Sequence, residues 1–373
     1  TRDLVEGGLI FSLTLGIIEF MHTGSQSVTM DKIVSLAKRR GFIFAGSDIY
    51  GGLANSWDYG PLGAQLRKNI KDHWWKQVVE TRHDMVGLDG AILMNPKVWE
   101  ASGHVETFHD PLVECKKCHH RFRADKLTDQ NICSDCGGEL TKASQFNLMF
   151  QTTIGPKSET SRPVYLRPET AQAIFVNFKN VLESTRKRLP FGIAQIGKAF
   201  RNEITPGNFI FRTLEFEQME MEYFVEEAEW EKHFDAWQEW MLAWAAQIGI
   251  DLKKIHATDI PEKDRAHYSK RTVDIEFDFP FGREELWGLA YRTDYDLVQH
   301  QSFSGKSLEY SDPEDNSKKF LPHVIEPSMG VDRTLLAILV SAYHEETVNN
   351  ETRVVMKFAP RMAPYQVAVL PLS

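Results

Sequence analysis

The chain has 373 residues, of which 42% are hydrophobic, 25% charged and 11% aromatic, and its formal net charge is −9. This composition excludes a disordered or fibrous chain, and the length is enough for two to three domains of average size. Four cysteines confined to one short segment exclude a secreted disulfide scaffold, and the negative charge argues against a general nucleic-acid coat. We therefore expect a globular cytoplasmic protein. Such a protein could still bind one RNA through a local basic patch.

The first residues do not look like a membrane or export signal. Residues 7–20 form an apolar run that is short for a bilayer span, has acidic residues in its flank, and is not followed by a small-residue cleavage site. We expect residues 1–29 to be an extension and the main fold to begin at Met30.

Apolar spacing and turn residues give the elements in chain order. They predict a helix over 31–40, a helix over 61–83, a strand over 87–96 ended by Pro96, a polar insert over 112–142, strands over 165–169, 191–203 and 214–225, a helix over 228–248, strands over 272–279 and 286–291, and a strand, turn and helix over 324–345. Pro61 suits the first turn of its helix. We interpret the tryptophan stripe at 230, 237, 240 and 244 as a core contact rather than an aromatic ligand site.

Strands dominate the middle of the chain and few crossover helices separate them. This favours an α+β domain built on an antiparallel sheet. We expect one main domain over 30–360, with the insert at 112–142 and a helical insertion at about 226–270. Residues 365–373 read as the opening strand of a further domain that starts near 361, and we expect the remainder of that domain to be missing.

The sharpest chemical pattern lies in segment 200–220. It reads FRNE, an eight-residue loop with Pro206, and then Arg-x-x-x-Phe-x-x-x-Glu. On two strands joined by a loop, Arg201, Glu203, Phe216 and Glu220 share one sheet face. They offer a guanidinium for a phosphate, an aromatic ring for a base, and carboxylates for an amino group. Cross-strand ion pairing on an exposed face is the competing interpretation, and the spacing alone does not decide between them.

A second pattern, EPSMGVDR at 326–333, precedes an apolar helix. Arg333 follows the turn at Gly330 and is placed to meet an anion near the helix N-terminus. The competing interpretation is an arginine present only for its helix propensity.

These two segments, in this order, resemble motifs 2 and 3 of the class II aminoacyl-tRNA synthetases, and residues 61–96 resemble motif 1, the element of the dimer interface. The resemblance extends to the dimeric type of glycyl-tRNA synthetase and covers about residues 30–373. It is carried by SDIYGGLANSWDYGPLG at 47–63, NPKVWEASGH at 95–104, LRPETAQAIFVNF at 166–178, RTDYDL at 292–297 and EPSMG at 326–330.

The resemblance implies the class II synthetase fold and a homodimer that uses ATP with Mg²⁺ to join glycine to tRNA(Gly). It implies Arg201 and Arg333 as catalytic residues on the phosphates. The implied ATP-binding positions are Arg201, Asn202, Glu203, Phe211, Arg212, Thr213, Leu214, Glu215, Phe216, Glu285, Leu286, Gly330, Val331, Asp332 and Arg333, with Glu285 as a candidate Mg²⁺ ligand. The implied glycine-binding positions are Glu169, Phe216, Glu217, Gln218, Met219, Glu220, Glu326, Pro327, Ser328 and Gly330.

Two alternatives share the fold: a paralogue that makes adenylates or dinucleotides without charging tRNA, and a non-catalytic binding module. The motif arginines and the pocket glutamates are all in this chain, which favours an enzyme.

The cysteines form a separate pattern, Cys115-x-x-Cys118 and, fourteen residues later, Cys133-x-x-Cys136. This is the spacing of a structural four-thiolate zinc site, supported by glycines after the second pair. Two disulfides or a decayed metal site are the alternatives. We interpret His119 and His120 as solvated rather than as ligands. The nearby basic residues suit either the tRNA acceptor stem or a solvated face: Lys116, Lys117, Arg121, Arg123 and Lys126.

Overall fold

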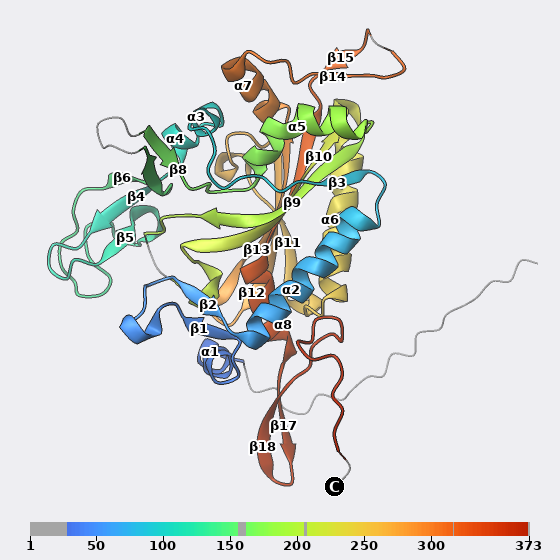
Figure 1. The fold of residues 1–373 in the computed structure, drawn as a ribbon. Helices are drawn as coiled ribbons and strands as arrows, with labels where there is room; N and C mark the ends of the chain where they lie inside the picture. The colour runs from blue at the N-terminus through green and yellow to red at the C-terminus, as the bar shows by residue number, and fades with distance from the viewer. Residues whose placement is uncertain (1–27, 156–161, 205–206, 316, 372–373) are drawn as a thin grey trace, which may run out of the picture.

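The computed structural model describes residues 28–155, 162–204, 207–315 and 317–371, and its centre is a seven-stranded sheet (Figure 1). The strand order is β11-β12-β13-β16-β10-β9-β3, and the pairings are antiparallel except that β3 runs parallel to β9. The strands are β3 (Met85–Gly87), β9 (Phe191–Phe200), β10 (Glu215–Val225), β11 (Ile255–Asp259), β12 (Arg271–Phe279), β13 (Gly282–Thr293) and β16 (His323–Gly330). The predicted α+β class with an antiparallel sheet is confirmed.

One face of this sheet packs against helices to form the main hydrophobic core. The helices are α1 (Met30–Arg39), α2 (Pro61–Trp75), α6 (Trp230–Gln247) and α8 (Val331–Ala342). Side chains alternate along β10, so Met219, Met221 and Tyr223 enter the core, whereas Gln218, Glu220 and Glu222 belong to the opposite face. The core thus leaves the opposite face free for polar chemistry.

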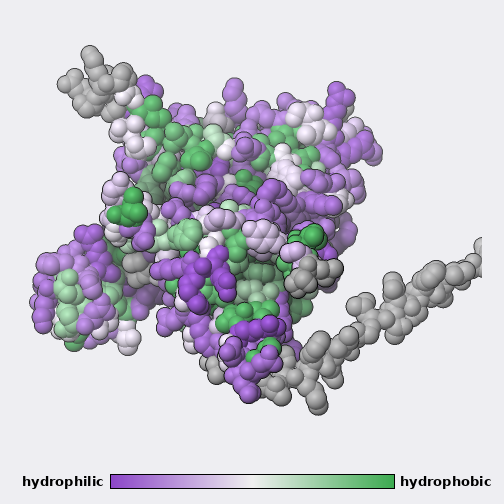
Figure 2. Space-filling view, turned by 60° about the horizontal axis from the view of Figure 1, so that its bottom comes forward, coloured by the Kyte–Doolittle hydropathy of each residue, from purple (hydrophilic) through white to green (hydrophobic). Residues whose placement is uncertain are grey.

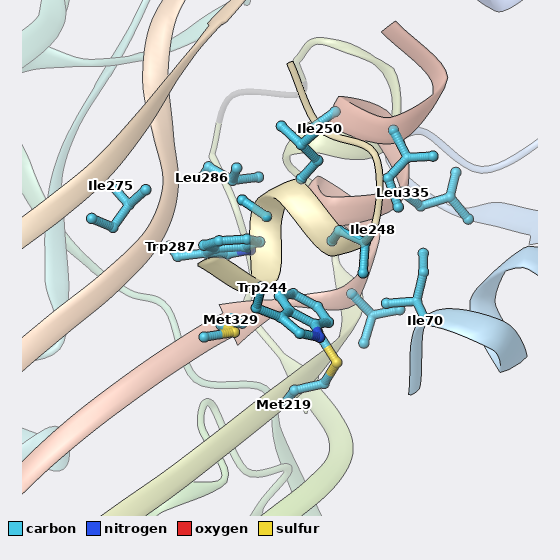
Figure 3. Packing of buried hydrophobic residues seen from close by; sticks show 14 of the residues in the cluster. Ile70, Met219, Trp244, Ile248, Ile250, Ile275, Leu286, Trp287, Met329 and Leu335 are labelled. Carbon is cyan, nitrogen blue, oxygen red and sulfur yellow. The ribbon is translucent and has the colours of Figure 1, made fainter. Parts of the chain in front are cut away.

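The tryptophan stripe of α6 packs on this core, as predicted. Trp237 and Trp244 are buried, and Trp230 and Trp240 are half-buried against the same cluster. Figure 3 shows Trp244 among aliphatic, methionine and aromatic side chains from the sheet, from α2 and α8, and from the segment after α6. Its indole N–H donates to Nδ1 of His73, 2.9 Å away, so the polar atom of this buried ring is satisfied.

The opposite face is covered only in part. Helices α5 (Ala171–Thr185) and α7 (Tyr295–Ser304) pack there on a second cluster, which includes Phe178, Phe191 and Phe224. The middle of this face, over β10, β12, β13 and β16, carries the pocket described below.

A small unit stands apart at the left of Figure 1, after α3 (Lys97–Ala101) and α4 (His104–Thr107). It is a three-stranded sheet of order β5-β4-β6, formed by β4 (His109–Glu114), β5 (Arg121–Arg123) and β6 (Ser144–Asn147), and the segment from 112 to 142 lies within it. Its surface in Figure 2 is mainly hydrophilic, which agrees with the polar insert that we predicted.

Short two-stranded ladders complete the described fold. They pair β1 (Ile43–Ala45) with β2 (Trp57–Tyr59), β7 (Gln151–Ile154) with β8 (Arg162–Tyr165), β14 (Tyr310–Ser311) with β15 (Lys319–Phe320), and β17 (Tyr343–Val348) with β18 (Glu351–Met356).

Several predicted elements differ from the structure. Helix α2 ends at Trp75 and continues as a π-helical turn over Lys76–Glu80, short of residue 83. The strand predicted over 87–96 is wrong, because β3 ends at Gly87. At Gly90, side chains take the place of ladder hydrogen bonds: its N–H donates to Gln195 Oε1 (2.6 Å) and its carbonyl accepts from Arg167 Nη1 (2.7 Å).

Three further differences concern a shifted, an added and a missing strand. The strand predicted over 165–169 lies earlier, at Arg162–Tyr165. The segment 226–270, expected as a helical insertion, also contains β11, which is the edge strand of the central sheet. Residues 365–371 form no strand; their side chains are exposed, and a strand needs a paired neighbour to satisfy its backbone.

In the described part of the chain, no helix combines the length and the apolar character needed to cross a membrane. The apolar run at 7–20 and Pro206 of the loop after FRNE lie outside the described residues.

Candidate active site

A cavity of about 320 Å³ opens on the polar face of the central sheet. Its lining comes from β10, β12, β13 and β16, from the segments before α5 and after β9, and from the start of α8. It brings together most of the residues singled out in the sequence: Glu169, Arg201, Glu203, Phe211, Arg212, Thr213, Phe216, Gln218, Glu220, Glu285, Leu286, Glu326, Ser328, Gly330, Asp332 and Arg333.

The remaining candidate positions do not line the cavity. They are Asn202, Leu214, Glu215, Glu217, Met219, Pro327 and Val331. The alternation of strand side chains explains Met219 of β10, which is fully buried in the main core on the other face. Val331 is the first residue of α8 and is buried in the same core. Glu217 also points to that side, where it pairs with Arg67 at 3.0 Å.

One end of the cavity carries three arginines. Arg201 lies over the ring of Phe216, with 5.3 Å between the guanidinium carbon and the ring centroid. Arg212 pairs with Glu203 (3.4 Å), and Arg333 pairs with Glu285 (3.0 Å). Guanidinium groups suit phosphate oxygens and an aromatic ring suits a base, so this end has the groups that a nucleotide needs.

A β-bulge in β13 explains how Glu285 reaches this end. Ile275 pairs with Trp287, but the next pair along β12 is Glu276 with Glu285, so Leu286 is an extra residue. Leu286 and Trp287 can then both pack in the core, with Leu286 at the edge of the cavity. Glu285 remains on the same face of the sheet as Gly288, and both line the cavity. Bulges re-aim side chains in this way next to active sites.

The other end of the cavity is acidic and buried. Glu169, Glu220 and Glu326 line it, each less than a tenth exposed. Glu220 accepts hydrogen bonds from the hydroxyls of Thr170 and Ser328, the latter at 2.7 Å. Such a group of carboxylates can bind a small cation, and its hydroxyl donors orient the oxygens.

Arg292 and Asp296 complete this end and were not assigned from the sequence. Arg292 donates to both oxygens of Asp296 (2.8 and 3.0 Å) and to Glu326 (2.8 Å), and all three are buried. Arg292 is the extra residue of a second bulge, between the pairs Tyr291–Ile325 and Thr293–Val324. The period-two pattern therefore could not place it, although RTDYDL was visible as a family-like motif.

His104 holds Glu169 from the side of α4. Its Nε2 lies 3.2 Å from Glu169 Oε2, and its Nδ1 lies 2.8 Å from the hydroxyl of Ser102. Gln172 donates to Glu169 (3.0 Å) and to Asp296 (2.9 Å), which ties the acidic groups into one network. A network satisfied in this way is rigid, so the carboxylates are held ready for a ligand.

Burial and mutual repulsion shift the pKa values of these acids. Burial raises the pKa of Glu220, and the charge of Glu169 adds to the rise. Burial also raises the pKa of Glu326 to about 8, against the opposing effect of Arg292. Burial acts in the same direction on Glu169, but His104 and Arg292 outweigh it and lower the pKa of Glu169. The raised pKa values of Glu220 and Glu326 show that the cations of this end do not fully balance its acidic groups.

The four cysteines form a second cluster, in the small unit of β4, β5 and β6. Their sulfur atoms all lie within 4.8 Å of one another, and the two closest pairs, Cys115–Cys136 and Cys118–Cys133, are 3.5 and 3.7 Å apart. These distances exclude disulfides, whose sulfurs are about 2 Å apart. They fit a tetrahedral zinc site, since Zn–S bonds of about 2.3 Å give sulfur separations of about 3.8 Å.

The backbone around the cysteines also fits a metal. The N–H groups of Lys117 and Cys118 donate to the sulfur of Cys115, and these donors lower the pKa of Cys115 to about 6. A Cβ at Gly138 would lie 3.0 Å from that sulfur, so glycine leaves the close approach open. Three of the five nearby basic residues pair with carboxylates: Lys116 with Glu139, Arg121 with Glu114, and Arg123 with Asp110 and Asp125.

Known proteins resemble this chain along most of its length. Residues 150–342 match the tRNA synthetase class II core domain (G, H, P, S and T). A glycine–tRNA ligase of Caldanaerobacter subterraneus is 51% identical and one of Alkaliphilus oremlandii is 52% identical, over 93% and 92% of this chain and 81% of each relative.

Among solved structures, a prolyl-tRNA synthetase of Cryptosporidium parvum in complex with L-proline and AMP superposes with a TM-score of 0.58 at 13% identity. The alignment covers 90% of this chain and 56% of that one, and it supports the fold. With half of its residues identical to those relatives and a pocket built on motifs 2 and 3, the chain belongs to the glycine–tRNA ligase family of the class II tRNA synthetases.

Proposed function

We propose that this chain activates glycine with ATP to glycyl-adenylate, releasing pyrophosphate, and then transfers the glycyl group to the 3′ end of tRNA(Gly). The observation that supports this most is that one cavity is lined both by buried carboxylates and by arginines. Three buried carboxylates lie at one end, and Arg201, Arg212 and Arg333 lie at the other. An amino acid and a nucleotide triphosphate need these two environments side by side.

ATP takes the arginine end. Phe216 stacks on the adenine ring and Glu203 accepts from its amino group, while Arg201 binds the α-phosphate. Arg212 and Arg333 bind the outer phosphates from opposite sides of the cavity. Glu285 is the residue proposed to hold Mg²⁺, which when bound supplies charge neutralisation along the triphosphate. Its Oε2 lies beside Arg333, so cation and arginine would share the outer phosphates.

Glycine takes the acidic end, with its ammonium group among Glu169, Glu220 and Glu326. The ammonium must supply the affinity, because glycine has no side chain to bind. Larger amino acids are excluded by lack of space. A pocket that must reject a substrate smaller by one methylene has only about 1–3 kcal/mol to use, but no amino acid is smaller than glycine, so no editing step is needed.

The reaction needs positioning and charge neutralisation more than proton transfer. In the first step a carboxylate oxygen of glycine attacks the α-phosphorus, and the bond to the bridging oxygen of pyrophosphate breaks. In the second step the terminal ribose hydroxyl of the tRNA attacks the acyl carbon and AMP leaves. Arg201 and Arg333 stabilise the charge that develops in the first step, and no side chain forms a covalent intermediate.

Zinc binding, a cytoplasmic location and dimer formation accompany this function. The four-cysteine cluster holds a structural zinc, because its donor set is closed and leaves no open coordination position. None of its four cysteines forms a disulfide, which suits a reducing cytoplasm. The chain forms a homodimer through the region of α2, and exposed apolar side chains between β1 and β2, at Ile49, Tyr50 and Leu53, offer further surface for a partner.

Glycine-dependent exchange between ATP and pyrophosphate tests the proposal. We expect exchange with glycine and none with alanine or serine, and we expect Arg201→Ala to abolish it. Arg283→Ala, a half-exposed arginine outside the cavity, is the matched control and should keep full exchange. Folded protein without glycine-dependent exchange would refute the proposal. Exchange without charging of tRNA(Gly) would favour a paralogue that only forms adenylates.

A further inference from the structure

Behind the acidic end of the cavity lies a buried carboxyl group, Glu222, that the proposed reaction does not use. It follows Glu220 by two residues on β10 and therefore shares the same face of the sheet. Its side chain is fully buried, and neither oxygen has a hydrogen-bond partner among the described residues. One oxygen from each of Glu220, Glu222 and Glu326 lies within 4.8 Å of the others, so Glu222 points into the acidic group.

The charged neighbours of Glu222 are mostly acidic. The groups that act on it are Glu220 on its own strand, Glu326 on β16, Arg292 on β13 and Asp296 on α7. Arg292 is the cation of this group, and its hydrogen bonds already go to Asp296 and Glu326. A further negative charge without a donor is very unfavourable in such a place, and burial accordingly raises the pKa of Glu222 well above its ordinary value, with Glu326 adding to the rise.

Burial raises the pKa of all three acids, and their hydrogen bonds indicate which one holds its proton most firmly. Glu326 accepts from Arg292, and Glu220 accepts from the hydroxyls of Thr170 and Ser328. Glu222 accepts from no donor in the part of the chain that the structure describes. As a neutral acid it becomes a donor itself, with carboxylate oxygens of Glu220 and Glu326 close by to accept its proton.

We propose that Glu222 holds a proton in the empty site and releases it when glycine binds, so that glycine exchanges its ammonium charge for this proton. The O–H bond of Glu222 breaks, its proton passes by way of the cavity carboxylates to water, and the ammonium replaces the lost positive charge. The total charge among the acidic side chains is thereby unchanged on binding, while the carboxylate of glycine adds its negative charge on the side of the arginines. This inference rests on the proposed function, since it takes glycine as the ligand.

Proton release has a measurable consequence for affinity. If about one proton leaves per glycine bound, the dissociation constant for glycine falls about tenfold for each unit of rising pH while Glu222 is protonated in the free protein. Glu222→Gln keeps the neutral, donating form at every pH. This variant should therefore bind glycine with an affinity that no longer changes with pH through this group, and at high pH it should bind more weakly than the parent protein.

The test is titration calorimetry of the whole chain with glycine, at one pH, in buffers of different ionisation enthalpy. The slope of the observed heat against buffer enthalpy counts the released protons. We expect about one for the parent, close to none for Glu222→Gln, and the parent value for Glu226→Gln. Glu226 follows β10, outside the cavity, and pairs with Lys318 at 2.8 Å.

Each result decides a different point. Glycine binding without proton release by the parent would overturn this inference and leave the proposed function intact. Equal proton release by Glu222→Gln would overturn the assignment to Glu222. No binding of glycine, with no exchange activity, would overturn both. If Glu222→Gln does not fold, infrared difference spectra of the parent decide: loss of a protonated-carboxyl band on adding glycine supports the inference, and its persistence overturns it.

Discussion

The buried arginine between the acidic groups gives the sharpest prediction for stability. We expect Arg292→Met to destabilise the protein by about 3–5 kcal/mol near neutral pH, because it leaves buried carboxylates without their cation. The guanidinium makes three hydrogen bonds, at 2.8, 2.8 and 3.0 Å, and it is 1% exposed. Methionine fills much of the volume, so the loss reports charge and hydrogen bonding rather than a cavity.

The loss should also depend on pH in a definite direction. Without Arg292, the folded variant should hold about one more proton than the parent in the acidic group, whereas the unfolded chains hold the same number. Stability of the variant relative to the parent then falls as pH rises, by about 1.4 kcal/mol per unit for one proton. Urea unfolding of both proteins at several pH values measures this difference.

The control is Arg283→Met, whose arginine pairs with Asp278 at 2.9 Å on the surface and is half exposed. That change should cost less than about 1 kcal/mol. A loss below about 1 kcal/mol for Arg292→Met, or one that does not change with pH, would show that the buried ion pairs do not act as we describe.

Three other changes test separate parts of the structure. Trp244→Ala should lower the free energy of unfolding by about 3–5 kcal/mol in urea titrations, and Trp240→Ala by less, because only Trp244 is fully buried. Cys118→Ser should reduce bound zinc, measured by metal analysis, from about one per chain to near zero, and an unchanged zinc content would count against the four-cysteine site. Burial, and then the charge of Glu285, raise the pKa of Asp274 to about 7, so ionisation of this carboxyl group lowers the stability of the fold as pH rises from about 4 to 7. Asp274→Asn should therefore raise Tm at alkaline pH and leave it unchanged in acid. The opposite trend would contradict this account.

The predictable part of the fold and site follows strict periodicity. The strand before Arg201 and the one from Glu215, and the helix after Gly330, have uninterrupted patterns, and the structure has them at those places. Two-residue alternation also predicted correctly that Phe216 and Glu220 share one face of the strand, and both line the cavity. Periodicity fails where side chains replace ladder bonds, as at Gly90, and where a strand has no partner, as after 365.

The unpredicted part of the site depends on contacts between distant segments. Arg292 is the extra residue of a bulge, and no local pattern shows which carboxylates it meets across β16 and α7. His104 is brought to Glu169 by α4, a helix of a single turn. Glu222 is different, because its alternation with Glu220 was readable in the sequence and would have placed it on the same face.

The ion pairs inside the cavity affect how the protein behaves among the many small anions of a cell. Arg212 and Arg333 are already paired with Glu203 and Glu285, so an anion must displace a carboxylate rather than water to reach them. A single phosphate or sulfate offers one such exchange, whereas a triphosphate replaces both carboxylates in one molecule. Competition from abundant inorganic anions should therefore be weak, and nucleotide affinity should depend less on ionic strength than three unpaired guanidinium groups would suggest.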